Sequence, residues 1–216
     1  WRQARMFGVP LIAFINKMDK LGANFSHAIE TIRERLKAHP LPIQWPLGAE
    51  SGFRGAVDLL EWKAVIWADD LGMTMQEAPV PADVEVEALA AREAMIETIV
   101  ETDDGLMERY LDGEDISVTD LRAALRKATI SGVIQPVLCG SSLRNKGVQP
   151  LLDAVVDFLP SPLDIPPVKG TNPKKDQLEE RPADSTAPLA ALIFKIAADP
   201  YVGRLAYFRV YSGKII

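Results

Sequence analysis

Two stretches of the chain share one order of hydrophobic and polar positions: an apolar strand, a polar loop and an amphipathic helix. The first stretch covers residues 11–36 and the second covers 133–159. The run 11–15 contains no polar residue, as expected for a strand buried on both faces of a parallel sheet. Ligands of such sheets bind beyond the carboxyl ends of the strands, so the polar loops 16–19 and 140–142 are expected to meet there.

The helix of the first stretch has apolar residues at helical spacing from Phe25 to Leu36. Asn24 is a suitable N-cap because its side chain can accept a hydrogen bond from a free N–H group of the first turn. Pro40 and Pro42 are expected to end this helical region.

The segment between the two stretches has a different pattern. Short alternating segments broken by glycines predict a small antiparallel sheet at 43–67. Helices are expected over 84–100 and over 119–129, the second with Thr119 as its N-cap. The predicted buried stripe of the first of these helices is Leu89, Met95, Ile96, Ile99 and Val100.

The C-terminal part is first rich in proline, and after residue 188 its side chains follow the alternating pattern of β-strands. Seven of the 16 prolines fall between Pro160 and Pro188, which predicts a stiff, exposed linker. Two strands joined by a turn at 199–203 follow, as at the opening of a barrel. The expected parts are a core at 1–42, an inserted α+β subdomain at 43–133, more core at 134–160, a linker at 161–187 and barrel strands at 188–216.

Composition excludes several classes of protein. The 216 residues contain no apolar run of the roughly 20 residues needed to cross a membrane. A single cysteine cannot form an internal disulfide, so a reducing, cytoplasmic setting is expected. Cys139 falls on an apolar strand and is expected to be a small buried side chain. No zinc-ligand cluster is present, and no metal ligand is assigned.

Charge is distributed unevenly. Residues 83–120 contain 13 acidic and 2 basic side chains, whereas the rest of the chain is net positive, although the whole carries −6. A partner could therefore recognise an acidic inserted part separately from a mildly basic body.

Asn16-Lys17-Met18-Asp19 is the sharpest chemical signal. A carboxylate has two acceptor oxygens that match the adjacent N1–H and 2-amino donors of guanine, and adenine lacks this donor pair. Asp19 is therefore expected to select the base. The stem of Lys17 can cover one face of the purine, and the amide of Asn16 can join neighbouring loops.

Ser141, Ser142 and Leu143 form the second candidate loop. Their consecutive backbone N–H groups follow the other strand, where one of them could donate to the guanine 6-oxygen. A phosphate loop of the form Gly-x-x-x-x-Gly-Lys-Ser/Thr is missing from the sequence. We therefore expect the base end of a nucleotide site without its phosphate end, in a chain that is an internal fragment.

These motifs together resemble translation elongation factor G. The segment 194–213 is similar to the start of that family's second domain, and 41–137 is similar to the insertion in its GTPase domain. The remaining similar segments are 1–4, 8–10, 14–20, 140–142, 145–149 and 159–164. At Ser142 the family usually has alanine, which is also small enough for a close approach to the base.

The resemblance implies an α/β fold: the C-terminal part of a P-loop-type GTPase domain with an α+β insertion, then the start of an all-β barrel domain. It implies GTP/GDP as ligand, with Asn16, Lys17, Met18, Asp19, Ser141, Ser142 and Leu143 as guanine-binding residues. It also implies Mg²⁺ in the intact protein. Catalytic residues and Mg²⁺ ligands are assigned to no residue of this chain, so the chain alone is expected to be inactive.

The resemblance also implies partners. A monomeric GTPase would promote movement of tRNA and mRNA on the ribosome, with contacts to rRNA and to the ribosomal stalk protein through the insertion, and with no membrane partner. Another ribosomal GTPase, such as a release or ribosome-protection factor, is an alternative. A non-enzymatic acidic binding module is an alternative of a different class.

Overall fold

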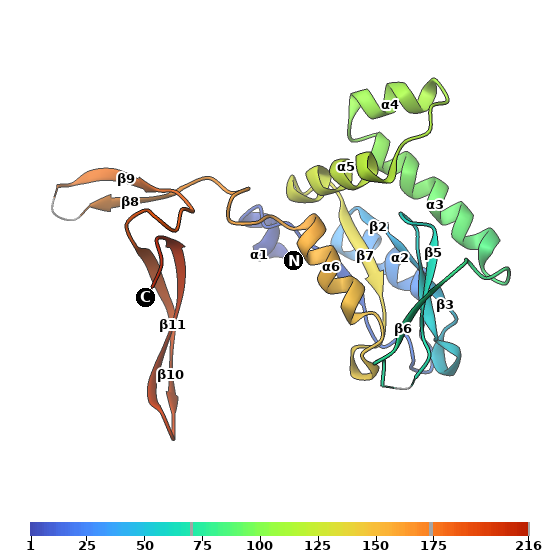
Figure 1. Cartoon of the computed structure of the whole chain (residues 1–216), viewed down its shortest axis with the longest axis horizontal. Helices are drawn as coiled ribbons and strands as arrows, with labels where there is room; N and C mark the ends of the chain where they lie inside the picture. The colour runs from blue at the N-terminus through green and yellow to red at the C-terminus, as the bar shows by residue number, and fades with distance from the viewer. Residues whose placement is uncertain (70, 173–174, 216) are drawn as a thin grey trace. The chain divides into compact units, whose positions relative to one another are not determined.

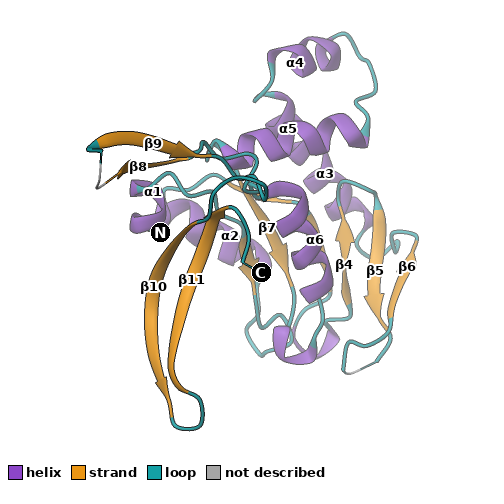
Figure 2. Ribbon diagram, turned by 60° about the vertical axis from the view of Figure 1, so that its left-hand side comes forward, coloured by secondary structure: helices purple, strands orange, loops and turns teal. Residues whose placement is uncertain are grey.

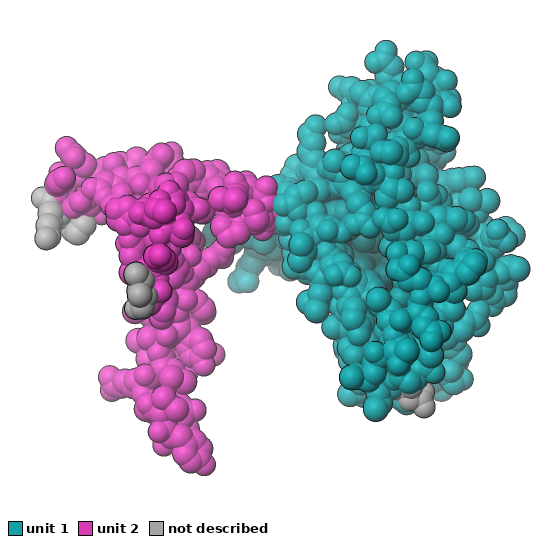
Figure 3. Space-filling view, viewed as in Figure 1, with its two compact units in different colours: residues 1–159 teal, residues 160–216 magenta. Residues whose placement is uncertain are grey.

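The computed structural model describes residues 1–69, 71–172 and 175–215. Ile216, the last residue of the expected barrel part, lies outside the described residues. The chain forms two compact units, Trp1–Leu159 and Pro160–Ile216 (Figure 3).

A three-stranded parallel sheet lies at the centre of the first unit. Its strand order is β1 (Ala13–Ile15), β7 (Gln135–Cys139) and β2 (Pro40–Pro42). Ile15 pairs with Cys139, so the two strands end level with each other and both polar loops leave the same edge. The expected parallel pairing of the two apolar strands is confirmed.

Strand β2 was missed by the sequence pattern. Pro40 and Pro42 lie beyond the helix, as expected, but they also form an edge strand against β7. An edge position suits proline because one side of the strand needs no hydrogen-bond donor. The expectation that 11–15 is buried on both faces is wrong, since β1 is itself an edge strand and Ala13–Ile15 are only half-buried.

Two helices accompany the first strand, α1 (Arg2–Met6) and α2 (Phe25–Leu36). The predicted cap of α2 is confirmed, because Asn24 accepts a hydrogen bond from the His27 N–H group.

Helix α6 (Val148–Phe158) follows the second strand and is apolar on more than one face. Ala154 and Phe158 are buried, whereas Leu152 and Val156 are exposed. Helical spacing identified the amphipathic helix, but it did not decide which apolar face packs on the sheet.

A second, antiparallel sheet follows β2 along the chain. Its strands are β3 (Gln44–Leu47), β4 (Gly55–Asp58), β5 (Lys63–Trp67) and β6 (Met75–Ala78), paired in that order. The short helix η1 (Glu50–Gly52) connects β3 and β4. The predicted sheet is present and extends one strand beyond residue 67 (Figure 2).

Three helices complete the first unit: α3 (Glu85–Val100), α4 (Asp104–Leu111) and α5 (Val118–Ile130). Sequence periodicity missed the short α4. Leu89, placed in the buried stripe of α3, is exposed. Ser117 rather than Thr119 caps α5, since its hydroxyl accepts from the Asp120 N–H group.

One hydrophobic cluster joins the two sheets and the helices. It contains Val57 and Leu59 near the antiparallel sheet, Ile99 of α3, Leu138 of β7 and Phe158 of α6. The segment between β2 and β7 therefore shares its core with the parallel sheet and does not fold around a core of its own.

The second unit consists of two hairpins. Strands β10 (Ala190–Asp199) and β11 (Gly203–Ser212) form the antiparallel pair expected from the alternating pattern. Strands β8 (Val168–Asn172) and β9 (Gln177–Arg181) form another hairpin, inside the segment 161–187 that was expected to be a linker. Alternation over five residues is too short a signal to outweigh the surrounding prolines. Across the described residues, no helix is long and apolar enough to cross a membrane.

Candidate nucleotide-binding site

The loops after β1 and β7 are joined by the side chain of Asn16. Its Nδ2 donates to the Ser142 hydroxyl at 2.9 Å, and its Oδ1 accepts from the Ser142 backbone N–H at 2.9 Å. The same Oδ1 accepts from the Lys17 N–H at 2.7 Å. Sequence reasoning assigned this joining role to Asn16, and the structure confirms the contact.

Lys17 and Met18 are placed differently within the first loop. Lys17 has a left-handed backbone, with φ of 65°, and its side chain is exposed. Met18 is 1% exposed, and its N–H donates to Gly140 O at 3.0 Å. Met18 therefore anchors the loop, whereas Lys17 is accessible to a ligand.

Asp19 lies in an environment that keeps its carboxylate ionised. The neighbouring Ser141 hydroxyl lowers the pKa of Asp19, and Lys20 lowers it further. Lys20 Nζ is 3.3 Å from Oδ2, and Arg144 Nε is 4.0 Å from the same atom. Both oxygens of an ionised carboxylate are acceptors. Such a carboxylate can therefore accept hydrogen bonds from two neighbouring N–H donors.

One oxygen of Asp19 retains an unused acceptor position. Within the described part of the chain, the buried atoms Asp19 Oδ1 and Ser141 Oγ have no hydrogen bond of good geometry. The Ser141 hydroxyl lies beside the Asp19 carboxylate but makes no hydrogen bond of good geometry with it. A buried acceptor without a partner is costly, and a donor from a ligand would remove that cost.

The N–H groups of the second loop are not equivalent. Ser141 N–H donates to Lys146 O at 2.8 Å, and Ser142 N–H donates to Asn16. Within the described structure we find no protein acceptor for Leu143 N–H, and Leu143 is exposed. The sequence predicted that one of these three N–H groups could donate to the base, and Leu143 N–H is the one that no protein acceptor occupies among the described residues.

Close backbone packing fixes the start of this loop. A Cβ atom at Gly140 would lie 2.3 Å from Lys146 O and 2.7 Å from the Phe14 ring. Glycine is therefore required where the chain leaves β7 beside β1.

Sequence reasoning missed two residues, in the β3–β4 and β5–β6 connections of the antiparallel sheet, that support these loops. Glu50 N–H donates to Met18 O at 2.7 Å, and Gly72 O accepts from Asn145 Nδ2 at 3.1 Å. Neither residue lies in a recognisable motif. What distinguishes them is their backbone conformation: Glu50 has a positive φ of 56°, and Gly72 has a positive φ of 64°.

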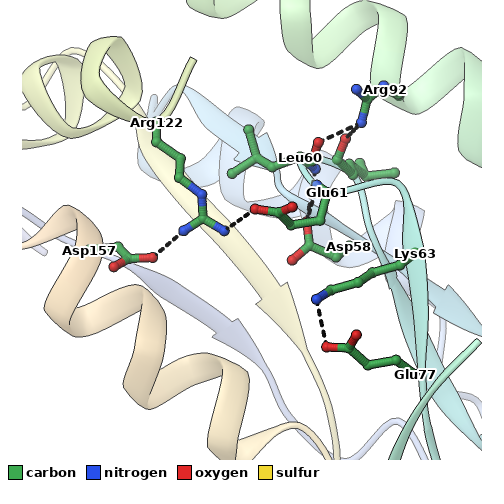
Figure 4. A network of polar contacts seen from close by, with 9 residues as sticks. Asp58, Leu60, Glu61, Lys63, Glu77, Arg92, Arg122 and Asp157 are labelled. Carbon is green, nitrogen blue, oxygen red and sulfur yellow. Dashed lines mark hydrogen bonds and ion pairs between the residues drawn. The ribbon is translucent and has the colours of Figure 1, made fainter. Parts of the chain in front are cut away.

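A second polar cluster lies away from the loops, between the antiparallel sheet, α5 and α6 (Figure 4). Arg122 forms ion pairs with Glu61 at 2.8 Å and with Asp157. Burial raises the pKa of Asp58, and the N–H groups of Glu61 and Leu60 partly offset that effect. These contacts hold secondary-structure elements together. Among the described residues, no group of three His, Cys, Asp or Glu side chains is placed to hold a metal ion.

Residues 1–161 match the family of elongation factor Tu GTP-binding domains. The chain belongs to this family. The α/β architecture of the first unit agrees with this family of GTP-binding domains. The loops joined by Asn16 lie within the matched residues.

A solved structure supports the relationship. The chain is 31% identical to a protein of Thermus thermophilus known from its crystal structure, with a TM-score of 0.77. The match covers 99% of this chain and 29% of the Thermus protein. The chain therefore spans less than a third of that relative's length.

Proposed function

We propose that this chain supplies the guanine-recognition part of a translational GTPase that promotes ribosomal translocation. The observation that carries the proposal is the pair of hydrogen bonds between Asn16 and Ser142, which brings the Asp19 carboxylate and the Leu143 N–H group to one edge of the sheet.

Recognition would proceed through both ends of the Watson–Crick edge of the base. Asp19 accepts from the N1–H and 2-amino groups, and Leu143 N–H donates to the 6-oxygen. Adenine presents an amino group where the 6-oxygen of guanine stands, so a backbone donor rejects it. Lys17 covers one face of the ring through its methylene stem.

Nucleotide hydrolysis belongs to the intact protein in this proposal. The unpartnered Asp19 Oδ1 fits a guanine ligand. Mg²⁺ would supply charge neutralisation at the phosphates when bound, and we assign it no ligand from this chain. By itself, the chain is proposed to bind the base without hydrolysing GTP.

The acidic helices are the proposed contact with a ribosomal partner. Residues 83–120 carry 13 acidic side chains, and α3 and α4 lie at the periphery of the first unit (Figure 1). The resemblance to elongation factor G suggests the stalk protein as that partner. A release or ribosome-protection factor would use the same base site, so a translocation assay with the full-length protein separates these functions.

The Asp19→Asn variant of the full-length protein tests base recognition. An amide can donate to the 2-oxygen of xanthine, which a carboxylate repels, so GDP should bind more weakly and XDP more tightly. Asp112→Asn, an exposed change at the end of α4, is the matched control and should alter neither affinity. Failure of the unmodified protein to bind GDP, or an unchanged GDP to XDP ratio in Asp19→Asn, would refute the proposal.

A further inference from the structure

The antiparallel sheet sends two loops to the edge where the candidate base loops lie. One is the β3–β4 connection, which contains η1, and the other is the β5–β6 connection. In Figure 1 both connections and the carboxyl end of β7 lie at the lower end of the first unit. Each connection touches a different base loop.

Glu50 of η1 supports the loop that carries Asp19. Its backbone N–H donates to Met18 O at 2.7 Å, on one side of Asp19. Its side-chain Oε1 accepts from the Gly22 N–H at 2.7 Å, on the other side. One residue thus holds the backbone both before and after the base-selecting carboxylate.

Gly72 of the β5–β6 connection supports the other base loop. Its carbonyl accepts from Asn145 Nδ2 at 3.1 Å and from Gln149 Nε2 at 3.3 Å. Its backbone packs so closely that a Cβ atom would lie 2.5 Å from Arg144 O and 2.6 Å from Asn145 O. A side chain at position 72 would therefore push the Ser142–Arg144 turn away.

The connection that carries Gly72 is itself held by Asp69. The Asp69 carboxylate accepts from the N–H groups of Leu71, Met73 and Thr74 at 2.6 to 3.0 Å. Because these hydrogen bonds hold the β5–β6 connection in place, a side chain added at Gly72 is expected to displace the neighbouring base loop and not the connection itself.

We propose that Glu50 and Gly72 are positioning residues for base recognition, each controlling the contact at one end of the Watson–Crick edge of guanine. Glu50 sets Asp19 against the 2-amino edge, and Gly72 sets the Leu143 N–H group against the 6-oxygen edge. This inference rests on the proposed guanine binding. It makes the connections of the antiparallel sheet part of the selectivity of the site.

Gly72→Ala in the full-length protein tests the 6-oxygen edge. The probes are GDP, 6-thio-GDP, which changes only the 6-oxygen, and IDP, which lacks only the 2-amino group. GDP binding should weaken about tenfold, the magnitude of one lost hydrogen bond. The preference for GDP over 6-thio-GDP should shrink, whereas the preference over IDP should stay.

Gly113→Ala is the matched control. Gly113 has a similar positive φ of 78°, but a Cβ there meets no atom within 4 Å. It carries the same backbone penalty without pressing on the base loop, so all three affinities should remain those of the unmodified protein. Asn145→Gly removes one of the two donors to Gly72 O, the one within the base loop, and tests the same contact if Gly72→Ala does not fold.

Glu50→Ala and Glu50→Gln test the other edge. Both place a side chain at the same positive φ, but only glutamine keeps an oxygen that can accept from Gly22. Glu50→Ala should reduce the preference for GDP over IDP, whereas the preference for GDP over 6-thio-GDP should stay unchanged. Glu50→Gln should restore the preference for GDP over IDP.

The outcomes separate this inference from the proposed function. If the unmodified protein binds no guanine nucleotide, the proposed function fails. If it binds GDP, but the folded variants keep both preferences or lose both equally, the positioning roles of Glu50 and Gly72 are refuted.

Discussion

Asn16 and Ser142 are 126 residues apart in the sequence and are joined by two hydrogen bonds of 2.9 Å. The chain between them forms α2, β2, the antiparallel sheet and the helices α3, α4 and α5 before it returns to the parallel sheet at β7. The contact therefore requires the whole first unit to fold, and it places the two candidate base loops side by side.

Removal of the Asn16 side chain should weaken nucleotide binding. Asn16→Ala breaks three hydrogen bonds, and we expect GDP affinity to fall about 10- to 100-fold. Asn16→Asp keeps the acceptor, and the Ser142 hydroxyl can turn to donate, so its loss should be smaller. Titration of the full-length variants with a fluorescent GDP analogue measures both; equal losses would argue against the joining role.

Asp58→Asn should stabilise the first unit at neutral pH. Burial raises the folded-state pKa of Asp58, so ionisation of this carboxyl begins to oppose folding above its unfolded-state pKa and does so fully above its folded-state pKa. Asparagine keeps the acceptor for the Leu60 and Glu61 N–H groups. The gain in free energy of unfolding should be present at pH 7 and disappear near pH 3, where wild-type Asp58 is protonated in both states.

Asp69→Asn should change the free energy of unfolding in the opposite direction to Asp58→Asn. The N–H groups of Met73 and Thr74 lower the pKa of Asp69, so its ionised form favours folding above the unfolded pKa. This variant should be less stable than wild type at pH 7, and the gap should narrow as the pH falls through the folded pKa. Urea unfolding at several pH values measures both variants, and the same sign for the two would contradict the assignments.

Substitutions at Ser117 and Thr119 distinguish which of these two residues is the N-cap of α5. Ser117→Ala removes the acceptor for the Asp120 N–H and should cost about 1 kcal/mol in free energy of unfolding. Thr119→Ala lies inside the helix and should leave stability nearly unchanged or raise it slightly. Urea denaturation compares the two; a larger loss for Thr119→Ala would place the cap where the sequence pattern put it.

Cys139 should be unreactive in the folded protein. Burial raises the pKa of its thiol to about 12, which leaves almost no thiolate at pH 8. Iodoacetamide should modify it at pH 8 only after unfolding in guanidinium chloride. Rapid modification of the native chain would show that β7 opens to solvent.

The sequence by itself determined the repeated strand, loop and helix, because local apolar spacing and caps are short-range properties. It predicted Asn16 and Asp19 as site residues from side-chain chemistry and the second candidate loop from its backbone N–H groups after a strand. It also placed Cys139 among the buried residues. It could not identify β2, because two prolines oppose a strand unless it lies at an edge.

Only the tertiary structure decided which apolar faces are covered and which donors remain available. Leu152 and Val156 have the helical spacing of core residues but are exposed, and Ser142 N–H is taken by Asn16. Glu50 and Gly72 lie in no recognisable motif. Their contacts run through backbone groups and one side-chain oxygen, Glu50 Oε1, to loops far along the chain. Burial and hydrogen-bond pairing depend on such long-range neighbours, which no local pattern encodes.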